Sequence, residues 1–99
     1  MARRESARVA RAQRALGEQF RAWRKLQSLT IEQVAERANT TRQTVARLEQ
    51  GDGSVSLGIV LDVARSLGLL DSLVKSLDPF ETDLGRARAE DQLPQRVRT

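Results

Sequence analysis

The sequence predicts an all-α fold of five helices, and three observations lead to that prediction. The apolar residues recur at the three- and four-residue spacings of amphipathic helices. Each of the middle apolar stretches follows a Ser or Thr, the residues that cap helix N-termini. The chain of 99 residues has only 2 Phe, 1 Trp and no Tyr, which favours small packed helices over strands. That length is enough for one modest core, so we expect one domain with tails.

The first helix is predicted from Ala12 to about Gln27. One apolar stripe with spacings of four, four and three consists of Ala12, Leu16, Phe20 and Trp23. We expect Trp23 to pack in or beside the core. Residues 1–11 are rich in Arg and lack an apolar face, so they are predicted to be a basic arm or an extension of this helix.

Two short helices, predicted over 30–38 and 41–50, follow. Thr30 and Gln33 have the spacing of a capping box, and Thr41 is placed to cap the second of the two helices. Only Val45 and Leu48 of that second helix face inward by the helical period. Its opposite face carries Arg42, Gln43, Ala46 and Arg47. Two helices joined by three residues are typical of a helix-turn-helix, whose second helix presents this face to a partner.

The domain is predicted to end at residue 78. Ser56 is placed to cap a fourth helix that ends before Gly68, with an inward face of Leu57, Val60, Leu61, Ala64 and Leu67. The fifth helix carries Leu70, Leu73, Val74 and Leu77, which either close the core or form a dimer seam. The domain thus covers 12–78, and the tail covers 79–99. This tail is either a disordered extension, or its Phe80 and Leu84 dock on a dimer while its arginines reach phosphate or a partner: Arg86, Arg88, Arg96 and Arg98.

Charge is unevenly distributed along the chain. Residues 1–50 carry 11 basic and 5 acidic side chains, whereas residues 51–99 carry 6 and 8. The basic half is where a polyanion would bind, and its abundant Arg favours bidentate contacts with phosphate and guanine. With no Cys and no His, the chain lacks the side chains of most metal, haem and nucleophilic sites, so we expect no catalytic residue, metal or cofactor. No segment approaches the length of a membrane span, so we expect a cytoplasmic protein without a membrane partner.

The motif resembles a known family. The stretches over 29–35 and 40–51 are similar to the Cro/CI (XRE) repressors, with Ala35, Val45, Leu48-Glu49 and Gly51 at matching positions. The segments over 77–86 and 93–98 look like those of HipB-type antitoxin regulators, which are associated with HipA-type kinases. In the Cro/CI family the position of Glu49 commonly pairs with the Arg that is Arg24 here, so the resemblance implies a structural ion pair.

Docking of the third helix in a major groove agrees with this resemblance. Base readout is expected from Arg42, Gln43, Ala46 and Arg47. Phosphate contacts are expected from Thr30, Ile31, Thr41, Thr44, Arg21 and Arg24. The resulting hypothesis is a homodimeric repressor on double-stranded operator DNA with inverted half-sites, which the HipB resemblance extends to autoregulation and to neutralising a HipA-type kinase toxin. The alternative is an interaction module that mainly binds such a toxin, with DNA binding secondary.

Overall fold

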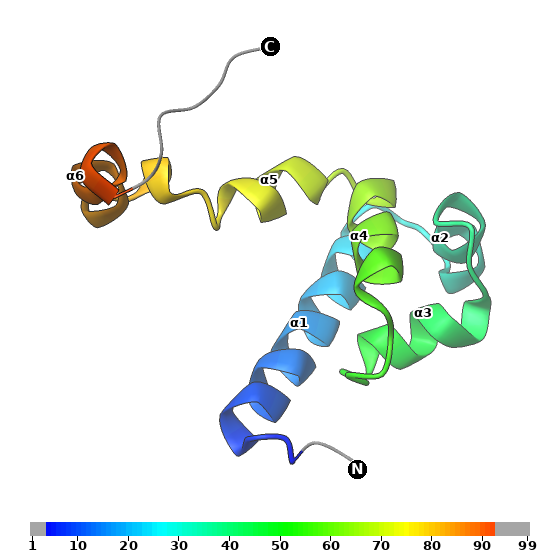
Figure 1. Cartoon of the computed structure of the whole chain (residues 1–99). Helices are drawn as coiled ribbons and strands as arrows, with labels where there is room; N and C mark the ends of the chain where they lie inside the picture. Colours follow the sequence, from blue (N-terminus) through cyan, green and yellow to red (C-terminus); the bar gives the residue numbers. More distant parts are fainter. Residues whose placement is uncertain (1–3, 93–99) are drawn as a thin grey trace.

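The computed structural model describes residues 4–92, and all regular structure in that range is helical (Figure 1). The all-α prediction is therefore confirmed for these residues. The elements in chain order are α1 (Ala7–Leu26), α2 (Ile31–Arg37), α3 (Arg42–Glu49), α4 (Leu57–Ser66), α5 (Leu70–Lys75), the 3₁₀ helix η1 (Pro79–Glu81) and α6 (Asp83–Gln92).

Side-chain caps set where the helices begin. The Thr30 hydroxyl accepts from the Gln33 amide at 3.0 Å, and the Thr30 amide donates to Gln33 Oε1 at 2.8 Å, which completes the capping box of α2. Thr41 and Ser56 cap α3 and α4 through their hydroxyls alone, which accept from the Thr44 and Ile59 amides. The predicted starts of α2, α3 and α4 are therefore confirmed. The sequence could predict them because each cap joins residues only three positions apart.

The N-terminal segment joins the first helix. Ser6 caps α1 by accepting from the Val9 amide at 3.1 Å, so the helix begins at Ala7 and residues 7–11 are its first turns. For residues 7–11 the structure therefore has the helix extension of the two alternatives.

The core lies where α1, α2, α3 and α4 meet. Its buried apolar residues are Phe20, Val34, Ala35, Ala38, Val45, Leu48, Val55, Val63, Ala64 and Leu67. In the predicted stripe of α1 only Phe20 is buried, whereas Leu16 and Trp23 are 47% and 45% exposed. The predicted inward face of α4 was wrong at two positions. Leu57 is exposed and Val63 is buried, because the face that packs on the core has the helical spacing of Val60, Val63, Ala64 and Leu67.

The C-terminal segment is helical up to residue 92, so of the two alternatives for the tail the disordered extension is wrong for the described residues 79–92. Asp78 Oδ1 accepts from the Phe80 amide at 2.9 Å at the start of η1, and the Thr82 hydroxyl accepts from the Gly85 amide at 2.9 Å at the start of α6. Figure 1 shows α5, η1 and α6 extending away from the α1–α4 core. Arg96 and Arg98 lie outside the described residues.

Candidate nucleic-acid interface

The turn between α2 and α3 fixes their relative orientation. Asn39 has a φ of 55°, a left-handed conformation that Asn adopts more readily than most residues. The Thr40 amide then donates to the Ala35 carbonyl at 2.9 Å, which ties the turn back to α2. At the other end of α3, Gly51 has a φ of 81° and turns the chain toward α4. The sequence of α2, turn and α3 thus forms a helix-turn-helix.

The inner face of α3 is anchored on the core. Val45 is fully buried and Leu48 nearly so, as the helical period predicts. Gly17 of α1 lies against the C-terminal turn of α3, where a Cβ atom on it would stand 2.6 Å from the Glu49 carbonyl oxygen. The backbones of α1 and α3 are therefore in direct contact at this point, and α1 packs against the C-terminal turn of α3.

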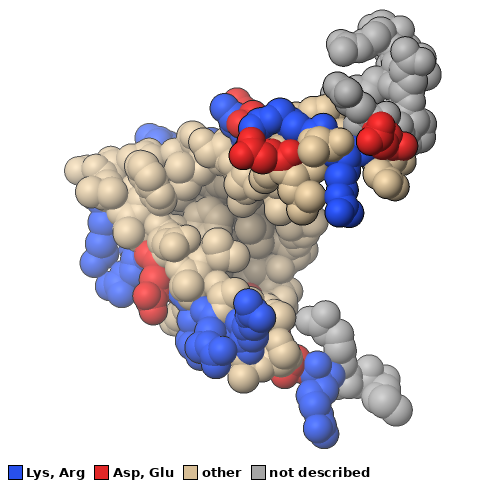
Figure 2. Space-filling view, turned by 90° about the vertical axis from the view of Figure 1, so that its left-hand side faces the viewer, with Lys and Arg blue, Asp and Glu red and all other residues tan. Residues whose placement is uncertain are grey.

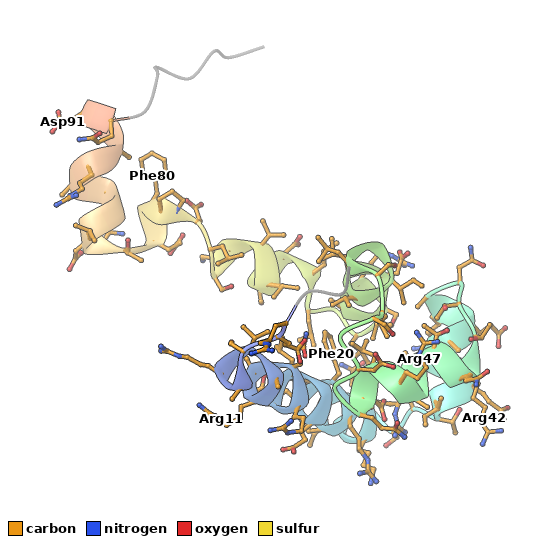
Figure 3. The ribbon with its side chains drawn as sticks, turned by 60° about the horizontal axis from the view of Figure 1, so that its bottom comes forward. Arg11, Phe20, Arg42, Arg47, Phe80 and Asp91 are labelled. Atoms are coloured by element: carbon orange, nitrogen blue, oxygen red, sulfur yellow. The ribbon has the colours of Figure 1, made fainter. Side chains whose placement is uncertain are left out.

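The outer face of α3 holds the four residues predicted to read bases. Arg42 and Gln43 are exposed, while Ala46 and Arg47 are partly covered by neighbouring residues. Figure 3 shows Arg42 and Arg47 at two points along α3, with Arg11 far away on α1. A face with two guanidinium groups, one amide and one methyl group offers the chemistry that base edges in a major groove require.

Both arginines of this face have carboxylate partners in the free chain. Arg42 Nη1 lies 3.3 Å from Glu32 Oε1, and both side chains are largely exposed. Arg47 Nε donates to Asp52 Oδ2 at 3.2 Å, and its Nη2 donates to the Ser54 hydroxyl at 3.3 Å. Exposed pairs of this kind contribute about 1 kcal/mol or less, so a nucleic acid can replace them at little cost.

Asp52 and Ser54 form a turn that the sequence analysis did not identify. The Ser54 hydroxyl and amide both donate to Asp52 Oδ1, at 2.7 and 2.8 Å. These bonds, together with the nearby Arg47, hold the pKa of Asp52 below its usual value. The carboxylate therefore stays charged and positions the Arg47 side chain at the edge of α3. The Asp-Gly-Ser run, in which Asp accepts from the residue two positions on, was the available sequence signal.

The residues predicted to contact phosphate lie mainly at helix N-termini. Thr30 and Ile31 begin α2, and Thr41 and Thr44 begin α3 with their hydroxyl oxygens 2.8 Å apart. The first amides of a helix have no carbonyl four residues before them, so such ends attract anions. The two N-termini belong to α2 and α3, the two helices of the helix-turn-helix.

Arg24 has a different role from the phosphate contact suggested for it. Its Nε and Nη2 donate to Glu49 Oε2 and Oε1 at 2.7 and 3.1 Å, and its Nη1 donates to the Leu29 carbonyl at 2.9 Å. Arg24 is only 9% exposed, and its pKa is raised by the bonds to Glu49. Since all three nitrogens have partners within the chain, Arg24 joins α1 to α3, and exposed Arg21 remains the phosphate candidate of α1.

The four residues of the predicted dimer seam differ in their packing. Leu73 packs against the core and Leu70 is half-buried, whereas Val74 and Leu77 are 62% and 83% exposed. Helix α5 thus closes one side of the core. Val74 on this helix and Leu77, which lies after its end at Lys75, are not buried by anything in the described part of the chain.

Residues 4–92 hold no group of three or more Asp, Glu, His or Cys placed to bind a metal ion. None of the described helices has the length and apolar character to cross a membrane.

The comparisons with known proteins agree with this geometry. A family described as "Helix-turn-helix domain" matches residues 15–77, well over half of the chain. An "Uncharacterized HTH-type transcriptional regulator" of Methanothermobacter thermautotrophicus is 48% identical over 49 residues, which cover 50% of this chain and 71% of that protein. No solved structure matches the chain significantly. The chain belongs to the family of helix-turn-helix domain proteins and is a DNA-binding transcription regulator.

The cap of α3 provides a first test of how the motif is built. Thr41→Ala removes the acceptor of the Thr44 amide bond of 3.1 Å and is expected to lower the free energy of unfolding by about 1 kcal/mol. Thr41→Ser keeps an acceptor and should stay within a few tenths of a kcal/mol of the parent. Urea denaturation followed by circular dichroism measures both, and equal stabilities of the two variants would contradict the capping role.

Proposed function

We propose that this regulator is a repressor that binds an inverted-repeat operator as a homodimer. The observation that carries the proposal is the outer face of α3, held on the core by Val45 and Leu48 and turned outward with two arginines and one glutamine. A helix supported in this way enters a major groove, where its N-terminal residues meet base edges.

Each residue of that face has a role that follows from its chemistry. Arg42 and Arg47 donate in pairs to guanine O6 and N7, Gln43 bonds adenine N6 and N7, and Ala46 contacts a thymine methyl group. The N-termini of α2 and α3, with Thr30, Ile31, Thr41 and Thr44, bind phosphates on either side of the groove, and Arg21 adds a contact from α1. On binding, Glu32 and Asp52 release the arginines to the DNA.

The domain division and the wider biology belong to the same proposal. Residues 12–78 form the DNA-binding unit, flanked by 1–11 and by the tail 79–99. A dimer bound at its own promoter excludes polymerase and needs no catalysis. Because it acts on DNA, the protein is proposed to work in the cytoplasm. The resemblance of residues 77–86 to HipB-type regulators supports autoregulation and a HipA-type kinase toxin as protein partner.

The test compares operator binding by the parent with that of Arg42→Ala/Arg47→Ala. The probe is a labelled fragment from upstream of the gene, titrated at several salt concentrations beside random DNA of equal length. Loss of two bidentate contacts should weaken specific binding roughly a hundredfold or more, because each discriminates by about 1–3 kcal/mol. Parent binding should fall steeply with salt.

A charge-matched control separates readout from general attraction. Arg65→Ala/Lys75→Ala removes the same charge from α4 and α5, on exposed side chains away from α3, and should change affinity only a few-fold. If both double variants lose the same affinity, α3 does not read sequence. A parent that binds the upstream fragment no better than random DNA but co-purifies with a kinase would favour the toxin-binding module.

A further inference from the structure

The described chain has the shape of an open wedge. Figure 1 shows α1 as one limb and α5, η1 and α6 as the other, with the limbs meeting near α4. The radius of gyration is 16.5 Å, whereas a compact chain of this length has about 13 Å. Figure 2 looks into the open side of the wedge, and the hollow between the limbs is lined mostly by residues without charge.

The closed end of the wedge is an apolar groove, by which we mean the cavity of about 240 Å³ between α1 and α5. It includes Leu16 and Trp23, the two stripe residues of α1 that the core does not bury. Its full lining is Leu16, Gln19, Phe20, Trp23, Ala64, Leu69, Ser72, Leu73 and Ser76. No lining residue is charged, so burying this surface needs no compensating ion pair.

The limb beyond the groove, residues 77–92, carries apolar side chains of its own and is called the arm below. Leu77 and Leu84 are 83% and 65% exposed. Within the described part of the chain, α6 packs chiefly against η1 and not against the α1–α4 core. Each chain therefore carries both an open apolar groove and an arm whose apolar side chains are exposed to solvent.

We infer that two copies of this chain exchange arms, so that the arm of each protomer lies in the groove of its partner. This inference rests on the homodimer in the proposed function and adds which surfaces meet. The arm leads away from the groove of its own chain because α5, from which it emerges, is one wall of that groove. In a two-fold symmetric dimer each arm–groove contact occurs twice, so both grooves and both arms are buried.

The distribution of charge fits a second copy as the occupant. The arm carries 5 acidic and 2 basic side chains, whereas α1 carries 1 acidic and 6 basic ones. An arm that enters the partner's groove runs beside the partner's α1, which brings opposite net charges together. The acidic limb and the basic limb thus complement each other between chains.

Cross-linking of single-cysteine variants tests the exchange, because the chain has no Cys of its own. Leu84→Cys on a longer tagged chain is mixed with untagged Ser72→Cys, and a short bismaleimide absorbs small differences in distance. We expect a mixed covalent dimer. The matched control is Ser54→Cys, an exposed serine beside α3 and outside the groove, which should give at least tenfold less mixed product.

Three outcomes would overturn the exchange. These are equal yields from Ser72→Cys and Ser54→Cys, a dimer in solution that gives no mixed product, and an intrachain link in a Leu84→Cys/Ser72→Cys double variant at high dilution. Neither cross-link depends on DNA, so mixed dimers from a chain that fails to bind operator would support the exchange while refuting the repressor.

The strength of the dimer gives a second readout. Leu77→Asp should weaken dimerisation roughly a hundredfold in sedimentation equilibrium, since a buried leucine is lost from each of two symmetric contacts. Leu26→Asp changes a similarly exposed leucine of α1 that does not line the groove and should leave the dimer unchanged. Both positions are outside the core, so neither variant should unfold, and equal effects of the two would contradict the proposed contact.

Discussion

Glu49→Ala is expected to lower the free energy of unfolding by about 3 kcal/mol, the low end for leaving one partner of a buried ion pair uncompensated. The Arg24 and Glu49 side chains are 11% and 8% exposed, and the guanidinium keeps only the Leu29 carbonyl when the carboxylate is removed. Since this pair joins α1 to α3, the variant should also weaken operator binding. Urea denaturation measures the first effect, and titration of operator DNA measures the second.

A double variant and a surface pair control this prediction. Arg24→Met/Glu49→Leu removes both charges and should recover most of the stability, because apolar residues of similar volume can replace a buried pair. Asp62→Ala breaks the exposed pair with Arg65 and should cost less than about 1 kcal/mol. Equal losses for Glu49→Ala and Asp62→Ala would show that the interhelical pair contributes no more than a surface contact.

Gly17→Ala is expected to destabilise the domain by about 2 kcal/mol, although alanine is the better helix former by about 1 kcal/mol. A Cβ atom would stand 2.6 Å from the Glu49 carbonyl oxygen and 2.7 Å from that of Leu48. Both atoms are backbone and cannot rotate away, so α3 must shift relative to α1. Thermal and urea denaturation measure the loss.

Gly58→Ala in α4 is the matched control, because nothing lies within 4 Å of the Cβ atom it would add. Here only the helix propensity and the unfolded-state entropy change, so stability should rise by up to about 1 kcal/mol. The two substitutions are chemically identical and should have opposite signs. Stabilisation by Gly17→Ala would mean that α1 and α3 are packed less closely than the structure shows.

Local signals predicted the helices of the motif and their starts. Thr30, Thr41 and Ser56 cap helices through amides only three residues away, so a single sequence contains both partners of each bond. The inward position of Val45 and Leu48 follows from the helical period alone. The DNA-reading role of the outer face of α3 stays a prediction, which the variants above address.

The helical C-terminal segment shows where local signals ended. Residues 83–92 are rich in Arg, Asp and Glu, and this mixed charge left a disordered extension as one of two alternatives for the tail. Their helix begins at the Thr82 cap, preceded by the turn that Asp78 and Pro79 start. Those signals were present, but without a periodic apolar face they are too weak to predict a helix from sequence.

The helical class, the caps and the polar outer face of α3 can be predicted from the sequence alone, because propensity, capping and periodicity act over a few residues. Which apolar residues are covered depends on how the helices pack in three dimensions. Phe20 is buried whereas Leu16 and Trp23 of the same stripe are about half exposed, since the burial of a stripe depends on which helices pack against it. Likewise, Arg24 is withdrawn from the surface only because Glu49, 25 residues away, meets it when α1 and α3 pack.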